Sequence, residues 1–303
     1  MLAKVLGRII NKPFLLGMTF ILVIFALAAG LPYFYLSEVR AFEEVSIPAE
    51  GYLLQGYLSP GKAPGGLWVV FVHGNRQDGQ AGELYRKLRN NLPGEVGVLA
   101  IDMRGFGKSS NEGMYQAARI LDRSEDLDAA VNYLKANLGV HETRIVLMGH
   151  SLGAYQVMKA AHRSEYRLVV SIGLGNWDAV LSSAEQVQQY IQKFNNNTSV
   201  SLTPERLYQE AASFTPGQLF SGCPQTQVIV IYGSMEDTIA QISPFYQEAQ
   251  ARCGRLLRWA TIPLADHMFS TENASLPVPV RTFFTNFSLG LLKLRLNHFL
   301  LSP

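Results

Sequence analysis

Short apolar runs rich in Val and Ile recur along this chain and constrain its fold more than any other feature. The runs are four to seven residues long and lie at 67–72, 96–101, 144–148, 168–172, 228–231 and 256–262. Strands that are apolar almost throughout are typical of a sheet covered on both faces. Stretches of helical periodicity, such as 124–138, lie between the runs. This alternation predicts an α/β fold with a mostly parallel central sheet and helices on both faces.

Three segments depart from the alternation. Residues 39–47 and 52–58 flank a Pro-Ala-Glu-Gly turn before the first run, and they predict an N-terminal antiparallel hairpin at the sheet edge. Residues 176–222 show weaker helical periodicity between two runs, and we expect them to form a small helical lid inserted into the domain. Residues 280–301 are amphipathic, which predicts a final helix packed on the sheet.

The N-terminal segment 13–36 is predicted to cross a membrane. Residues 14–36 carry no charged side chain, and a helix needs about 20 apolar residues to span a bilayer. Basic residues in 1–12 and acidic residues after 36 place the N-terminus in the cytoplasm by the positive-inside rule. We therefore expect a single-pass membrane protein whose domain, 39–303, lies on the exported side, periplasmic or lumenal. A cleaved signal peptide ending near Ala28 is the alternative.

The composition excludes several functional classes. A net charge of +2 with 48% hydrophobic residues fits neither a disordered chain nor a nucleic-acid-binding protein. Cys223 and Cys253 are the only cysteines, which excludes a multi-cysteine zinc module. Each precedes a predicted strand, and an exported domain permits a disulfide. Whether the two cysteines pair or remain separate buried thiols stays open.

The segment Gly149-His150-Ser151-Leu152-Gly153 joins a predicted strand to a predicted helix. Strand, tight turn and helix, with glycines two residues on either side of a serine, is the context of a nucleophile elbow. The glycines are needed because larger side chains there would collide with neighbouring backbone. We therefore predict Ser151 as a catalytic nucleophile.

A serine hydroxyl needs a base, and the base needs a carboxylate partner. His267 follows the last predicted strand, where its loop would face the elbow, whereas the side chain of His150 points away from its neighbour Ser151. The predicted strand before that one is the run 228–231, and the segment 233–237 after it contains two carboxylates, Glu236 and Asp237. We favour Asp237 as the acid, because the shorter side chain is the commoner partner, and Glu236 remains the alternative.

Two loops after strands complete the predicted site. The first, His73-Gly74-Asn75, would present the backbone N–H of Asn75 to an oxyanion, and Leu152 would supply the second donor. The second loop, 102–109, is rich in glycine but has Asp102 where a nucleotide-binding loop requires glycine. We expect this loop to be a structural turn fixed by an aspartate and an arginine.

Five motifs, FVHGN, DMRGFGKSS, GHSLG, YGSMED and ADHMFS, occur in this order, and from about residue 39 onward the chain resembles the α/β-hydrolase superfamily. It is most similar to the serine-aminopeptidase-like and monoacylglycerol-lipase-like branch, which includes membrane-anchored members. The resemblance implies serine-dependent hydrolysis of an ester, thioester or amide, with no metal and no organic cofactor. Two positions depart from the branch: Asp237 comes one residue late after Gly233, and Gln241 lies near a frequent proline.

These patterns together predict a serine hydrolase that cleaves a carboxylic ester or thioester of a small-molecule, lipid-like or acylated substrate. An aminopeptidase or amidase of the same fold is the first alternative, and a non-catalytic membrane-tethered scaffold is the second. The glutamates of the predicted lid that could bind a free amino terminus are Glu185, Glu205 and Glu210.

Overall fold

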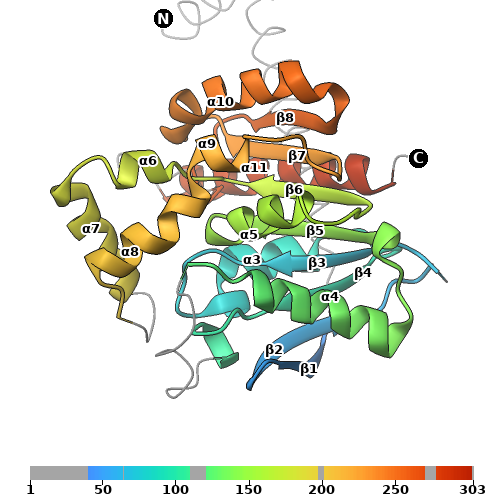
Figure 1. Ribbon diagram of the computed structural model, residues 1–303. Coiled ribbons are helices and arrows are strands. Elements are labelled where there is room, and N and C mark those ends of the chain that lie inside the picture. Colours follow the sequence, from blue (N-terminus) through green and yellow to red (C-terminus); the bar gives the residue numbers. More distant parts are fainter. Residues whose placement is uncertain (1–39, 64, 110–120, 197–200, 270–277, 302–303) are drawn as a thin grey trace, which may run out of the picture.

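A mostly parallel sheet runs through the domain (Figure 1). The computed structural model describes residues 40–63, 65–109, 121–196, 201–269 and 278–301. In these residues, eight strands lie in the order β1-β2-β4-β3-β5-β6-β7-β8, and only the pairs β1–β2 and β2–β4 are antiparallel. The strands are β1 (Glu43–Ala49), β2 (Tyr52–Ser59), β3 (Trp68–Val72), β4 (Gly97–Ile101), β5 (Ile145–His150), β6 (Leu168–Ile172), β7 (Val228–Gly233) and β8 (Leu257–Ile262). The predicted fold class and the N-terminal hairpin are confirmed.

Helices cover both faces of the sheet, and a separate apolar cluster fills each side. On one face, α3 (Glu83–Asn90) and α11 (Val278–Leu301) pack against alternate strand residues such as Val69 and Phe71. On the other, α4 (Ser124–Leu138), α5 (Leu152–Ala161) and α10 (Thr238–Cys253) pack against Val70 and Val72. The continuous apolar runs are thus explained, because successive side chains enter opposite clusters. The prediction of a final helix packed on the sheet is confirmed.

Between β6 and β7, helices occupy the segment predicted as a lid, residues 176–222, which we call the insertion. They are α6 (Trp177–Val180), α7 (Ala184–Asn195), α8 (Pro204–Ala211) and α9 (Pro216–Leu219), and α7 and α8 project to one side of the sheet (Figure 1). Side chains cap the starts of three of them: Asn176, Ser183 and Thr203 each accept a hydrogen bond from a backbone N–H of the first turn. Short 3₁₀ turns are η1 (Gly79–Ala81), η2 (Gly107–Ser109), η3 (Glu142–Arg144), η4 (Ala212–Phe214) and η5 (Gly254–Leu256).

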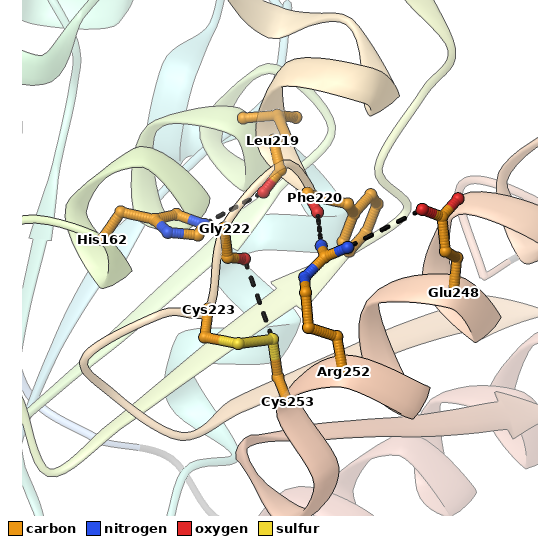
Figure 2. Close-up of a disulfide and its surroundings, with 8 residues drawn as sticks. All are labelled: His162, Leu219, Phe220, Gly222, Cys223, Glu248, Arg252 and Cys253. Atoms are coloured by element: carbon orange, nitrogen blue, oxygen red, sulfur yellow. Dashed lines mark hydrogen bonds and ion pairs between the residues drawn. A yellow bond between two sulfur atoms is a disulfide. The ribbon is translucent and has the colours of Figure 1, made fainter.

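A disulfide between Cys223 and Cys253 joins the residue that directly follows the insertion to the end of α10 (Figure 2). The Cα atoms are 5.4 Å apart. Two backbone carbonyls beside it are also held: Arg252 donates to Phe220, and the imidazole of His162 bonds Leu219 at 3.0 Å. The pairing that the sequence left open is therefore present.

The expected membrane localisation is corrected by the structure. Among the described residues, which run from 40 to 301 with gaps, no helix is long and apolar enough to cross a membrane. The segment 13–36, on which the transmembrane prediction depended, lies outside the described residues, as does the signal-peptide site at Ala28. The single-pass topology with an exported domain is therefore not retained.

Candidate active site

Ser151 lies on a sharp turn between the last residue of β5 and the first residue of α5. Its backbone has φ 52° and ψ −113°, a conformation that is strained for any residue with a side chain. A Cβ atom at Gly149 would collide with the carbonyl of Gly153, and one at Gly153 would collide with the carbonyl of Val72. The geometry is that of the predicted nucleophile elbow, and it depends on both glycines.

The structure brings Glu236, and not the favoured Asp237, to His267. Nδ1 of His267 donates to Oε2 of Glu236 at 2.8 Å, and the Glu236 side chain is only 2% exposed. Its other oxygen accepts from the backbone N–H of Gly233 at 2.7 Å. The turn after β7 folds Glu236 back over the strand end, whereas Asp237 is exposed at the start of α10. Adjacent side chains point apart, so only one of the two can reach the imidazole.

Gly173 makes room for His267. This glycine follows β6 directly and has φ +60°; a Cβ atom there would lie 3.0 Å from Cε1 of His267 and 3.5 Å from Oε2 of Glu236. Any larger residue would therefore press on the imidazole of His267. Sequence reasoning missed this position, although a glycine immediately after a parallel strand was a visible signal.

One pocket holds all the predicted residues except Asp237. It has a volume of about 490 Å³, and Ser151, His267, Asn75 and Leu152 are among the residues that line it. Nucleophile, base and both candidate oxyanion donors thus face a common space, while Asp237 does not line it. His267 is half-exposed and therefore accessible from the pocket.

The peptide group between Gly74 and Asn75 is held in a fixed orientation. The backbone N–H of Met103 donates to Nε2 of His73 at 3.0 Å, so the proton of this neutral ring lies on Nδ1, which donates to the Gly74 carbonyl at 2.6 Å. Burial lowers the pKa of His73 and keeps the ring neutral. In a trans peptide, the N–H of Asn75 points away from that carbonyl. His73 therefore fixes the direction of the candidate oxyanion donor.

Aromatic side chains form much of the pocket wall. Tyr155 from α5, Trp177 from α6 and Tyr190 from α7 line it together. The ring centroids of Tyr155 and Trp177 are 5.6 Å apart, and those of Trp177 and Tyr190 are 4.8 Å apart. Along α7, Gln186, Tyr190 and Lys193 recur at helical spacing and turn one face of the insertion toward the pocket.

None of the glutamates considered for binding an amino terminus lines this pocket. Glu185 is exposed and accepts a hydrogen bond from Gln189 at 3.1 Å, and Glu205 is exposed. Glu210 is buried, pairs with Arg206 and accepts from the backbone N–H of Leu121. Glu185 and Glu205 thus lie on the surface of the insertion, and Glu210 ties the insertion to the backbone of Leu121.

The glycine-rich loop 102–109 is structural, as predicted. Asp102 is fully buried and accepts from the backbone N–H of Gln80 at 2.6 Å and of Lys108 at 3.0 Å. Arg104 bonds Asp126 at 2.7 Å and so ties the same loop to α4. Within the described residues, no group of three or more His, Cys, Asp or Glu side chains is placed to hold a metal ion.

Comparison with known proteins identifies similar chains. The model of the alpha/beta hydrolase family matches residues 69–287. Protein phosphatase methylesterase 1 of Schizosaccharomyces pombe is 31% identical over 125 residues, which cover 39% of this chain and 36% of that protein. Other curated relatives are covered over 2% to 54% of their length.

Two solved structures have the same fold. The Pyrococcus furiosus esterase Pf2001 has a TM-score of 0.56 at 18% identity, with 82% of this chain and 92% of that chain covered. The Pyrococcus horikoshii acylaminoacyl peptidase has a TM-score of 0.60 at 13% identity, with 87% of this chain and 41% of that chain covered. At such identities the likeness concerns the fold alone.

Proposed function

Because this chain belongs to the alpha/beta hydrolase family, we propose that it hydrolyses carboxylic esters or thioesters through an acyl-enzyme on Ser151. The observation that carries the proposal is the hydrogen bond from His267 to the buried carboxylate of Glu236, because His267 lines the same pocket as the strained Ser151. The three residues follow one another in the order nucleophile, acid, base, which is the order of the nucleophile-elbow hydrolases.

Each group has a defined task in this reaction. The carboxylate of Glu236 accepts from the Nδ1–H of His267, and in the neutral form of the ring Nε2 then carries no proton and can act as the base. Oγ of Ser151 attacks the carbonyl carbon while His267 takes its proton and passes it to the departing alcohol or thiol. Water, deprotonated by the same histidine, then attacks the acyl-enzyme and releases the carboxylic acid.

The backbone N–H groups of Asn75 and Leu152 are the proposed oxyanion donors. Both residues line the pocket beside Ser151, and the fixed orientation of the Gly74–Asn75 peptide supports the role of the first. Each such donor contributes roughly 3 kcal/mol to stabilising the transition state.

The aromatic wall favours substrates with an apolar acyl or alcohol group, which is consistent with a lipid-like or acylated small molecule. The described residues that line the pocket include no Asp or Glu side chain. A free amino terminus would therefore lack a carboxylate partner there, and this disfavours the aminopeptidase alternative. The sequence motifs are similar to those of a branch that includes both esterases and peptidases. Amides therefore remain the second candidate class of substrate.

Labelling with a fluorophosphonate probe tests the nucleophile. We expect wild-type protein to be modified at Ser151 only, as mapped on the labelled peptide, and a folded Ser151→Ala variant to be inert. Turnover of p-nitrophenyl esters of increasing chain length, compared with aminoacyl anilides, then separates esterase from aminopeptidase activity. A folded wild-type protein that neither labels nor turns over any substrate would support the non-catalytic scaffold instead.

A further inference from the structure

Two loops that carry opposite sides of the site are connected through buried side chains. The candidate oxyanion donor follows β3, and the candidate base follows β8. We propose that Tyr85 and His150 form a positioning pair that fixes the positions of these two loops relative to each other and to Ser151. The inference rests on the proposed function, since it concerns the same reaction, and neither residue is assigned a chemical step.

A continuous series of hydrogen bonds carries the proposal. The backbone N–H of Gly74 donates to the hydroxyl of Tyr85 at 2.8 Å. That hydroxyl is 3.1 Å from Nδ1 of His150, and Nε2 of His150 is 2.8 Å from the backbone carbonyl of His267. The series therefore runs from the oxyanion loop to the backbone of the base itself.

The hydrogen positions in this series follow from its two ends. A backbone carbonyl can only accept, so Nε2 of His150 carries a proton and donates to His267. The remaining ring nitrogen, Nδ1, then accepts from the hydroxyl of Tyr85, which in turn accepts from Gly74. Every donor has one acceptor only if His150 is neutral. Burial, which lowers the pKa of His150 to about 3, keeps it so.

The pair lies too close to the nucleophile to be a remote packing feature. His150 is the residue before Ser151 and is fully buried, and Tyr85 is 1% exposed. A Cβ atom at Gly74 would lie 2.6 Å from the Tyr85 hydroxyl and 2.8 Å from Cβ of Ser151. Gly74 is thus packed closely between the Tyr85 hydroxyl and Ser151. Because its N–H also donates to that hydroxyl, a small shift of the hydroxyl would move the loop that presents Asn75.

The Tyr85→Phe variant tests the first half of the series. It deletes one hydroxyl, and we expect kcat on a p-nitrophenyl ester to fall roughly tenfold to a hundredfold. The reason is that the loops carrying the oxyanion donor and the base would no longer be held in the geometry that the reaction requires. KM should change by less than about threefold, because Tyr85 and His150 line the pocket but are only 1% and 0% exposed and so offer the substrate little contact surface. The matched control is Tyr246→Phe, which also deletes a buried hydroxyl, one with no hydrogen-bond partner among the described residues. Equal kcat losses in the two variants would overturn the proposal, as would full activity of Tyr85→Phe.

Substitution of His150 supplies the second test and protects against a folding failure of the first variant. The His150→Gln side chain keeps an N–H near the position of Nε2, whereas His150→Leu has none, so we expect the glutamine variant to retain at least fivefold more kcat. In the double variant Tyr85→Phe/His150→Gln, a connected pair predicts a loss smaller than the product of the single losses. Independent, multiplicative losses would overturn the proposal, while failure of wild-type labelling at Ser151 would instead reject the proposed function.

Discussion

At the scale of the residue, Glu236 has both carboxylate oxygens engaged, one by His267 and one by the backbone of Gly233. A carboxylate held at two points can keep the imidazole in one tautomer and stabilise the imidazolium that the proposed reaction would form. Asp237, one residue further, is exposed at the start of α10. The choice between the two acids is set by a single turn after β7.

Exchanging the two acids for their amides tests this choice. Glu236→Gln keeps the shape of the side chain but presents an N–H to His267, which favours the wrong tautomer, so we expect kcat to fall on the order of 10³- to 10⁴-fold. Asp237→Asn, as the control, should stay within about threefold of wild type. Kinetics on one p-nitrophenyl ester measures both, and a greater loss in Asp237→Asn would assign the acid to Asp237.

Gly173 offers a second prediction at this scale, with a control inside the same chain. Gly173 and Gly139 have similar φ angles, +60° and +62°, but a Cβ atom at Gly139 has no neighbour within 4 Å. Both alanine variants should lose about 1 kcal/mol of unfolding free energy from backbone strain. Only Gly173→Ala should also lose at least tenfold in kcat, because its methyl group presses on His267. Thermal unfolding and ester kinetics separate the two effects, and equal activity of both variants would contradict the role of Gly173.

At the scale of the element, strands and helices were largely predictable because their patterns are local. Val- and Ile-rich runs marked the parallel strands, and the glycines around Ser151 marked the turn between β5 and α5. The sequence did not decide between Glu236 and Asp237 as the acid, because the choice depends on the backbone conformation of one turn. The partners of His150 were not foreseeable either: they lie 65 and 117 residues away, and no local pattern records such contacts.

The disulfide between Cys223 and Cys253 should stabilise the junction between the insertion and α10. It closes a loop with a sequence separation of 30, which in the chain-entropy model corresponds to about 3 to 4 kcal/mol. We expect the double variant Cys223→Ser/Cys253→Ser to lose this amount in urea unfolding without reductant. In the presence of reductant, wild type and variant should converge. A difference that persists under reduction would show that the substitutions act by another route.

At the scale of the whole molecule, buried neutral histidines make stability depend on pH. Burial holds the pKa of His150 at about 3, below the usual 6.5, and also lowers the pKa of His73. At a pH between the lowered pKa of the folded protein and the usual value of about 6.5, each of these histidines binds a proton in the unfolded chain but not in the folded protein. The contribution of these two neutral rings to the free energy of unfolding therefore has its full value above about pH 6.5. It falls as the pH decreases, by up to about 1.4 kcal/mol per pH unit for each ring.

Urea unfolding between pH 7.5 and 4.5 measures this dependence. The His150→Gln variant removes one of the buried rings, so its stability should fall less steeply with decreasing pH than that of wild type. Asp122, whose pKa is lowered to about 2 chiefly by its hydrogen bonds to Lys159 and Ser124 against the opposing effect of burial, remains in both proteins and does not affect the comparison. Parallel pH dependences of the two proteins would contradict the assignment of His150 as a buried neutral ring.

The disulfide also changes how the chain is connected. Residues 223 to 253 form a covalent ring, and this ring contains β7, Glu236 and the whole of α10. A single proteolytic cut anywhere inside the ring leaves two polypeptides joined through sulfur, which migrate as one band on a gel until a reductant is added. After a cut between residues 223 and 253, the fragment that carries Glu236 therefore stays covalently linked to the other fragment through the disulfide.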